Sequence, residues 1–335
     1  MTKMKRWTHR PEMSNWGDFG PDDQKGRLNL ITPERRRAAA REVREGIAFP
    51  LSMPLDFPRG SGITDARLPP KLFATQLNGQ ATYNLRFSPP HRDVACDDAA
   101  VLYLQRSTQW DSLAHMGALF DADGSGEERK VYYNGYRGGL DIRNPDEADG
   151  PRALALGVEN MAETGVQGRG VLVDLRAECG TERVAFGYDR LMDVMRRQAV
   201  VVEEGDIVCF HTGMADLIVE AGDDEAKVRE AFQSCAVLDS SDTRLLHWIS
   251  EAGIAALAAD NFGIEDAHPH GPDDVLMPLH HHCIFKLGMP LGELWRLGEL
   301  AGWLRRNRRS RFLLTAPPLM LPGAVGSPVT PVATV

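Results

Sequence analysis

The sequence lacks the features that mark several large classes of protein. It has no run of about 18 apolar residues, and its N-terminal stretch has no apolar core of signal-peptide length. It has no dense block of Lys and Arg, only a short basic run at 305–309, which we expect to be the solvated end of an apolar helix. With a formal net charge of −9, these absences argue against nucleic acid and membrane partners. We therefore expect a cytoplasmic protein that acts on a small molecule.

Cysteine is scarce, and no pair has CxxC spacing. The five cysteines are an odd number and are widely scattered, which argues against a disulfide framework and against a zinc-thiolate site. We expect reduced thiols that are buried as small apolar side chains. They are Cys96, Cys179, Cys209, Cys235 and Cys283.

Two familiar catalytic patterns are missing as well. Gly168-Arg169-Gly170 precedes an apolar run but has the composition of a turn, without the Walker or dinucleotide-binding pattern. The sequence contains no GxSxG elbow and no Ser, His and Asp set typical of serine hydrolases. Serine-type acyl transfer is therefore unsupported.

A chain of 335 residues with 43% apolar residues can bury a large core, as one domain or two closely joined ones. Predicted strands alternate with predicted helices, which favours an α/β fold. Residues 47–95 are rich in Pro and Gly and fit short strands or a lid equally well, and the apolar tail at 317–335 should be packed. The predicted strands lie at 99–111, 170–175, 206–212, 254–259 and 312–315, and the predicted helices at 33–45, 188–198, 239–252, 278–287 and 291–304.

The densest group of chemically useful side chains lies at residues 105–115. On an extended chain Gln105, Gln109 and Asp111 would share one face, because alternate residues point the same way. His115 follows four positions later and converges on Asp111 if the chain turns into a helix. Two amide oxygens, a carboxylate and an imidazole could hold a divalent cation. The alternative is a polar strand end whose glutamines bond to backbone.

A second group is the run His280-His281-His282, followed by Glu293. Three adjacent histidines point in different directions on any regular element, so at most one or two can share a site. Such a run is more often a mixture of surface and capped residues than a metal cluster. Glu293 could also complement the dipole of a helix that begins near it.

Several other residues could line a pocket. His211 ends a predicted buried strand, where ligand-facing residues often sit in α/β folds. Trp110 and Tyr133 could wall a pocket for a flat or conjugated ligand, although core packing explains aromatic residues more often. His268 and His270 lie in a polar loop and could line a site or be solvated.

Together these residues resemble a known family, the cyclase and kynurenine-formamidase type of metal-dependent hydrolase. Residues 105–115 resemble its metal motif HxGTHxDxPxH, with Thr108, Asp111 and His115 matching. The stretches GRLNLITPE at 26–34, GRGVLVD at 168–174, ADN at 259–261 and GSPV at 326–329 also resemble the family's sequences. The resemblance extends over nearly the whole chain.

The resemblance implies a swivelling β/β/α fold, a mixed central sheet or barrel flanked by helices, in a single domain over 1–335 with an extended N-terminal segment. It implies a divalent metal, zinc first and manganese second, and a homo-oligomer, dimer or tetramer. It places Gln105, Gln109 and Asp111 at the first metal and makes His115 the acid/base or a further ligand. It makes His281 and Glu293 the residues that complete the catalytic site.

The departures from the motif affect the expected function. Gln105 and Gln109 replace two histidines, Ser107 replaces glycine and Leu113 replaces proline. The glutamine-bearing version is similar to that of zinc-dependent trans-dienelactone hydrolase, so lactone hydrolysis is the leading prediction. Arylformamidase activity is the alternative, as is lyase or cyclising chemistry. A metal-free scaffold would result if the glutamines had abolished metal binding.

Overall fold

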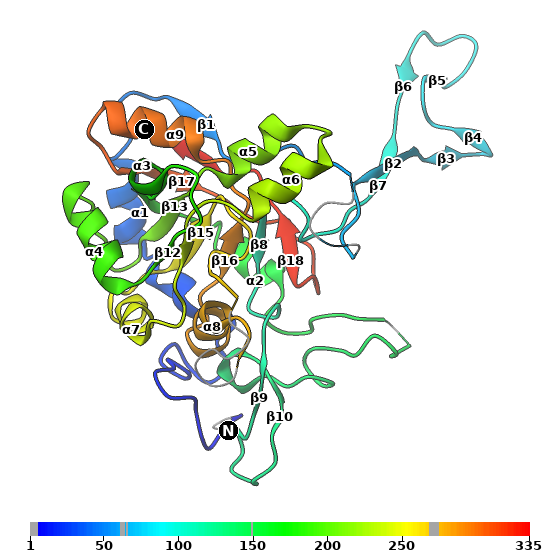
Figure 1. Ribbon diagram of the computed structural model, residues 1–335. Helices are drawn as coiled ribbons and strands as arrows, with labels where there is room; N and C mark the ends of the chain where they lie inside the picture. The colour runs from blue at the N-terminus through cyan, green and yellow to red at the C-terminus, as the bar shows by residue number, and fades with distance from the viewer. Residues whose placement is uncertain (1–5, 61–63, 65, 149, 268–274) are drawn as a thin grey trace.

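A nine-stranded sheet forms the centre of the computed structural model, which describes all residues except 1–5, 61–63, 65, 149 and 268–274 (Figure 1). Its strand order is β1-β19-β17-β11-β13-β15-β16-β8-β18. The strands are β1 (Ala48–Pro50), β8 (Gln109–Asp111), β11 (Gln167–Asp174), β13 (Ile207–His211), β15 (Ala256–Ala259), β16 (Leu291–Glu293), β17 (Arg311–Thr315), β18 (Gly326–Pro328) and β19 (Val332–Thr334). The four strands β11, β13, β15 and β16 are parallel, and the outer strands pair antiparallel. The predicted mixed, helix-flanked α/β fold is confirmed.

Helices cover both faces of the parallel strands because those strands are apolar on both faces. On β11, Val171 and Val173 belong to the core with helices α4 and α7, whereas Leu172 belongs to the core with α9. The helices are α1 (Pro33–Ala40), α2 (Val158–Ala162), α3 (Arg176–Cys179), α4 (Tyr188–Arg197), α5 (Met214–Ala221), α6 (Glu225–Phe232), α7 (Thr243–Glu251), α8 (Pro278–His280) and α9 (Gly298–Arg306). A π-helix, His281–Lys286, continues α8.

Most predicted elements are confirmed, and three differ. The helix predicted over 33–45 begins as expected, with the Thr32 side chain accepting from Arg35 N, but ends at Ala40. The strand predicted over 99–111 is divided by a turn into β7 (Asp98–Val101) and β8. The helix predicted over 291–304 is wrong at its start, because residues 291–293 form β16 between β15 and β8. Pairing with two neighbouring strands overrides the local preference of these residues for a helix.

The predicted packing of the apolar tail is confirmed from Gly326 on, since β18 and β19 join the central sheet and Val335 is buried, but Leu319, Met320 and Leu321 are exposed. All five cysteines are free thiols. Burial was predicted for all of them, but Cys96 is exposed and Cys179 is half-buried. Within the described part of the chain, no helix is both long enough and apolar enough to cross a membrane.

Two extensions leave the body, one at the upper right of Figure 1 and one at its bottom. The upper one, at 66–105, consists of hairpins: β2 (Lys71–Ala74) pairs with β7, β3 (Gln76–Leu77) with β4 (Gln80–Ala81), and β5 (Leu85–Arg86) with β6 (Val94–Ala95). The lower one contains β9 (Ala118–Phe120), β10 (Arg129–Val131) and the loops that follow. A short pair, β12 (Ala185–Phe186) with β14 (Val237–Leu238), lies beside the main sheet.

Candidate metal centre

Strand β8 places the predicted ligands on one face, as the period-two pattern requires. Gln109 and Asp111 point to the same side, and both are buried. Trp110, between them, points to the opposite side, where its ring packs edge-on against Trp295. On the neighbouring strand β16, Glu293 stands directly opposite Gln109. Two strands therefore bring an amide and two carboxylates to one spot.

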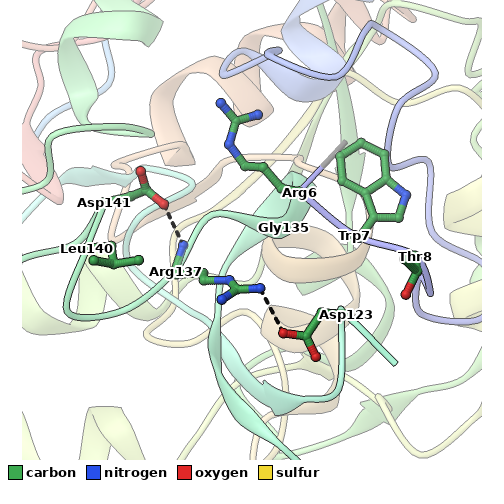
Figure 2. A pocket seen from close by; sticks show the side chains of 8 residues that line it. All are labelled: Arg6, Trp7, Thr8, Asp123, Gly135, Arg137, Leu140 and Asp141. Carbon is green, nitrogen blue, oxygen red and sulfur yellow. Dashed lines mark hydrogen bonds and ion pairs between the residues drawn. The ribbon is translucent and has the colours of Figure 1, made fainter. Parts of the chain in front are cut away.

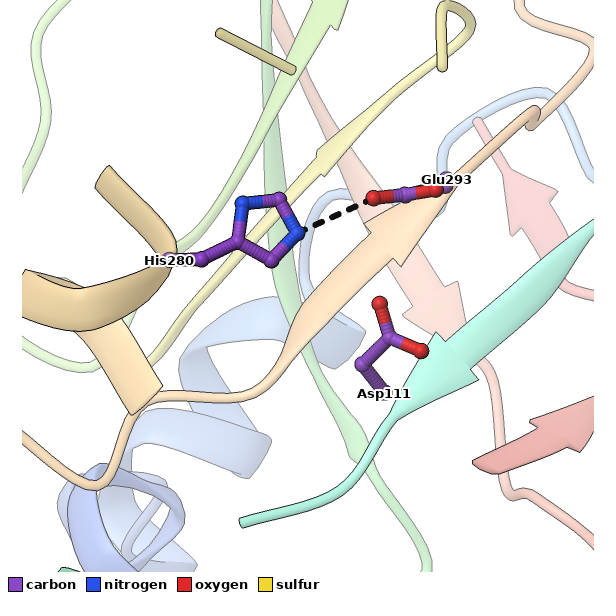
Figure 3. A group of neighbouring side chains, drawn as sticks. All are labelled: Asp111, His280 and Glu293. Carbon is purple, nitrogen blue, oxygen red and sulfur yellow. Dashed lines mark hydrogen bonds and ion pairs between the residues drawn. The ribbon is translucent and has the colours of Figure 1, made fainter. Parts of the chain in front are cut away.

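His280, from the end of α8, completes this cluster. One ligand atom each of Asp111, His280 and Glu293 lies within 4.8 Å of the other two, and all three residues are buried (Figure 3). The His280 Nε2 atom lies 3.1 Å from Glu293 Oε1. An imidazole and two carboxylates within this distance are a typical donor set for zinc or manganese.

The charge balance of the cluster fits a bound cation. Burial raises the pKa of Asp111; His115 opposes this shift and Glu293 reinforces it. One Asp111 oxygen, Oδ2, is buried without any hydrogen-bond partner. Burial opposes ionisation of Glu293 too, but the hydrogen bond from His280 lowers its pKa. Buried carboxylate oxygens with unused lone pairs are costly unless a proton or a metal ion satisfies them.

The orientation of the Gln109 amide points to the same conclusion. Its outer atom lies 2.6 Å from the Gln105 carbonyl and 3.2 Å from the Ser107 carbonyl, so this atom is the NH₂ group, donating to both. The amide oxygen then takes the position 3.4 Å from Asp111 Oδ1 and 3.3 Å from Glu293 Oε2. Three oxygens that face one another repel unless a cation lies among them. The residues present therefore fit a divalent ion.

Gln105 lies beside this cluster. It is half-buried, and a Cβ atom on Gly326 would come within 2.2 Å of its side-chain nitrogen. Gly326 stands opposite Asp111 in the pairing of β18 with β8. The absence of a side chain at this position therefore leaves room for the Gln105 amide next to Asp111.

His115 reaches the cluster from a turn rather than from the predicted helix. Its Nδ1 lies 3.8 Å from Asp111 Oδ1, and 22% of its side chain is exposed. Burial and the neighbouring histidines have the largest effects on the pKa values of Asp111 and Glu293. The charge of Arg67 has a smaller effect and lowers both pKa values. His115 is thus the ionisable group that connects the buried cluster with solvent.

The histidine run contributes one residue to the cluster, and it is His280 rather than the predicted His281. Successive residues of a helix point about 100° apart, so three adjacent histidines cannot face one site. The His281 ring packs at a tilt of 59° against Phe285, with 4.9 Å between ring centroids, and His282 Nε2 bonds to the Ser250 hydroxyl at 2.8 Å. His280 is the last residue of α8, and the π-helix begins at His281.

Glu265 is a functional residue that sequence reasoning missed. Its Oε1 accepts hydrogen bonds from His280 Nδ1 at 2.7 Å and from the His280 backbone at 2.9 Å. Burial lowers the pKa of His280, but the hydrogen bonds to Glu265 and Glu293 raise it to about 10. A carboxylate behind a metal-binding histidine fixes the orientation of the ring. No periodic pattern surrounds this loop residue, so the sequence carried no signal for it.

The predicted pocket walls lie elsewhere. Trp110 is fully buried, with its indole NH donating to the Ala316 carbonyl at 2.8 Å, so it is a core residue. Tyr133 is also fully buried, and its hydroxyl donates to Asp23. Core packing therefore accounts for both rings. His268 and His270 lie outside the described residues.

A cavity of about 400 Å³ lies on the lower extension (Figure 2). Its cationic side chains already have acidic partners: Arg6 bonds to Asp22, and Arg137 bonds to Asp123. The Arg137 backbone NH donates to Asp141. Both cations that line the cavity among the described residues are therefore already paired.

His211 belongs to a separate buried network at the ends of the parallel strands. Its Nδ1 lies 2.8 Å from Asp174 Oδ1 and its Nε2 lies 3.8 Å from Asp260 Oδ2, while Arg305 also pairs with Asp174. Burial lowers the pKa of His211, but the two carboxylates raise it by more, so the pKa lies above that of a free histidine. We interpret the residue as an ionic link between β11, β13 and β15, where the sequence predicted a pocket wall.

This network predicts a pH-dependent stability. A raised folded-state pKa means that the contribution of His211 is complete below the unfolded pKa of about 6.5 and is lost as pH rises through the folded pKa. His211→Gln should therefore destabilise the protein by about 3 to 5 kcal/mol near pH 6, and by less at pH 9. Urea unfolding of both proteins at the two pH values measures this difference. An equal or larger effect at pH 9 would contradict the assignment.

Comparisons with known proteins agree with the fold and with the family resemblance. The family model Cyclase ("Putative cyclase") matches residues 49–266, which is more than half of the chain. A crystal structure of a novel cyclase has 33% sequence identity, with a TM-score of 0.76, over 96% of this chain and 97% of its own. The chain belongs to the Cyclase family.

More distant structures share the cyclase fold. Isatin hydrolase A from Ralstonia solanacearum has a TM-score of 0.54 at 15% identity, over 90% of this chain and 97% of its own. Isatin hydrolase A from Labrenzia aggregata, bound to benzyl benzoate, has a TM-score of 0.53 at 13% identity, over 89% of this chain and 95% of its own. No curated protein matches this cyclase-family chain.

Proposed function

We propose that this cyclase-family protein is a metal-dependent hydrolase that uses water to open a lactone, in the manner of trans-dienelactone hydrolase. The observation that carries the proposal is the buried Asp111, His280 and Glu293 cluster with one Asp111 oxygen unsatisfied. The partly exposed His115 next to it supplies a group that can exchange protons with solvent. Isatin hydrolases with the same fold support hydrolysis as the reaction type.

Four side chains would hold the metal: Asp111, His280 and Glu293 directly, and Gln109 through its amide oxygen, with Gln105 beside them. Zinc is the first choice because the glutamine-bearing motif resembles a zinc enzyme, and manganese the second because most donors are oxygens. A bound divalent ion supplies Lewis acidity, which polarises a carbonyl and makes water a nucleophile near neutral pH. Amide oxygens donate less charge than imidazoles, so we expect removal of the metal by a chelator to be easy.

The remaining chemistry belongs to the protein. His115 has an imidazole within 3.8 Å of Asp111 and is partly exposed, so it can take a proton from water and return one to the leaving oxygen. Glu265 Oε1 accepts one hydrogen bond from the His280 ring and one from the His280 backbone NH, and so holds the ring in one orientation. The fixed ring keeps the donor set in place while His115 moves the proton.

The proposal is tested with two substrates, a conjugated lactone and an N-formyl aniline, on zinc-loaded and on chelator-treated protein. We expect chelator-sensitive hydrolysis with a higher kcat/KM for the lactone, restored when zinc or manganese is added back. Faster hydrolysis of the formamide would replace the lactone proposal by the arylformamidase alternative. Absence of turnover with either substrate in metal-loaded protein would favour a binding scaffold.

A further inference from the structure

One cationic side chain at the metal centre, Arg67, has no acidic partner among the described residues. Arg67 is half-buried, and it lies close enough to the cluster that its charge lowers the pKa of both Asp111 and Glu293. Within the described part of the chain, its guanidinium donates one side-chain hydrogen bond, to the Gln105 carbonyl at 2.7 Å. A guanidinium carries several N–H groups, so most of them remain available for another acceptor.

Two contacts place this guanidinium across the end of β16. The Gln105 carbonyl, which precedes β8, also accepts a hydrogen bond from the Gln109 amide at 2.6 Å. On the other side, the Arg67 Cζ atom lies 5.7 Å from the centroid of the Phe262 ring, which follows β15. In the sheet, β16 lies between β15 and β8 and ends at Glu293. The guanidinium therefore lies beside the strand ends that carry the cluster.

A second arginine holds the backbone of Arg67 in place. Arg106 is 3% exposed, and its guanidinium donates to the backbone carbonyls of Arg67, Pro58 and Gly60. Burying a charged group costs free energy unless its polar atoms are hydrogen-bonded, and these three carbonyls offset that cost. Because the backbone is anchored in this way, the Arg67 side chain is already in position before any ligand binds, which favours affinity.

The charge of Arg67 suits an anionic ligand. It does not help to hold a metal ion, since like charges repel, and the carboxylates of Asp111 and Glu293 already balance the charge of a divalent ion. A guanidinium binds a carboxylate through paired N–H groups. One guanidinium carries one positive charge, which matches a carboxylate better than a phosphate dianion. The group that Arg67 is placed to bind is therefore a carboxylate.

We propose that Arg67 binds a carboxylate that the substrate carries outside its reacting lactone bond. The inference rests on the proposed function and narrows the substrate class to lactones that bear a carboxylate. With the ester carbonyl at the cluster and the carboxylate on Arg67, the ring can enter in one direction only. Arg67 is thereby a residue that determines specificity, and the metal ion does not depend on it.

Two lactones that differ in one charge test the proposal: γ-butyrolactone-γ-carboxylate and the corresponding primary amide. Wild-type, metal-loaded protein should hydrolyse the carboxylate with a kcat/KM at least about tenfold higher. Arg67→Gln should lower kcat/KM for the carboxylate by about 10- to 100-fold, mainly through KM, the range expected for a hydrogen bond to a charged group. For the amide the loss should be less than about threefold. Arg67→Lys, which keeps the charge without the paired N–H groups, should recover part of the loss.

Arg36→Gln is the matched control. Arg36 is also a half-buried arginine that donates to a backbone carbonyl, that of Thr164 at 3.0 Å, but it lies on α1, which packs on β11 and β17. Its substitution should leave both rates within about twofold of the wild type. A calorimetric titration of metal-loaded protein gives a readout without turnover. Wild-type protein should bind glutarate at least about tenfold more tightly than its monoamide, glutaramate, and Arg67→Gln should bind the two within about threefold.

An equal loss for both lactones in Arg67→Gln, or no loss for either, would overturn the proposal. Loss of metal from this variant, measured by elemental mass spectrometry, would overturn it as well, because Arg67 would then support the centre itself. If wild-type protein hydrolyses neither lactone, the proposed function fails, and the titration alone decides: a preference for glutarate supports the role of Arg67, and equal binding overturns it. The wild-type comparisons need no variant, so a variant that fails to fold does not remove the test.

Discussion

Asp111→Asn is expected to remove the metal and to lower kcat/KM by at least about 10³-fold, because Asp111 carries a buried carboxylate oxygen that has no hydrogen-bond partner among the described residues. The amide has nearly the same shape, so the fold should be retained. Elemental mass spectrometry and initial rates on purified protein measure the two effects.

The matched control for this substitution is Asp193→Asn, at a surface carboxylate of α4 that pairs with Arg196 and Arg197. It should leave both metal content and rate within about twofold of the wild type, since surface ion pairs contribute little. An Asp111→Asn protein with full metal content and full turnover would show that the cluster is not the reaction site.

His280→Gln and His281→Gln form the second pair of variants, and we expect opposite outcomes. The structure places the His280 ring 3.1 Å from Glu293, whereas the His281 ring packs near Phe285. His280→Gln should weaken metal binding by at least about 100-fold, because even residues behind a metal ligand contribute 10- to 100-fold. His281→Gln should change it by less than about threefold.

The adjacent histidine is the control in this experiment, since both substitutions remove an imidazole from neighbouring positions of one helix. Metal titration in the presence of a competing chelator gives the two affinities. If His281→Gln were the damaging change, the helix would have a different phase in solution and the ligand set proposed here would be wrong.

Strand β8 shows what the sequence could predict about the site. Alternation along an extended chain places Gln109 and Asp111 on one face, and the structure has them there. Trp110 was predicted as a pocket wall, yet the same alternation sends it into the core on the other face. The spacing was informative because side chains alternate along any strand, so the shared face can be predicted without knowing which strands lie beside it.

The histidine run shows where such inference ends. A run of three identical residues fixes no helix phase, so the choice between His280 and His281 depends on how α8 packs. Glu293 could be named from the resemblance, but its place on a strand depends on pairing with β15 and β8. Glu265 was missed because its role arises from a contact with His280, fifteen positions along the chain.

The central claim is that these residues hold a divalent ion on which turnover depends. Its most direct test is the metal content of protein purified without an affinity tag, measured before chelation, after chelation and after zinc is added back, with lactone hydrolysis followed in the same samples. We predict about one equivalent of zinc or manganese per chain, with turnover that disappears on chelation and returns on reloading. Protein that holds no metal even after loading, or that hydrolyses the lactone equally well without it, would contradict the account.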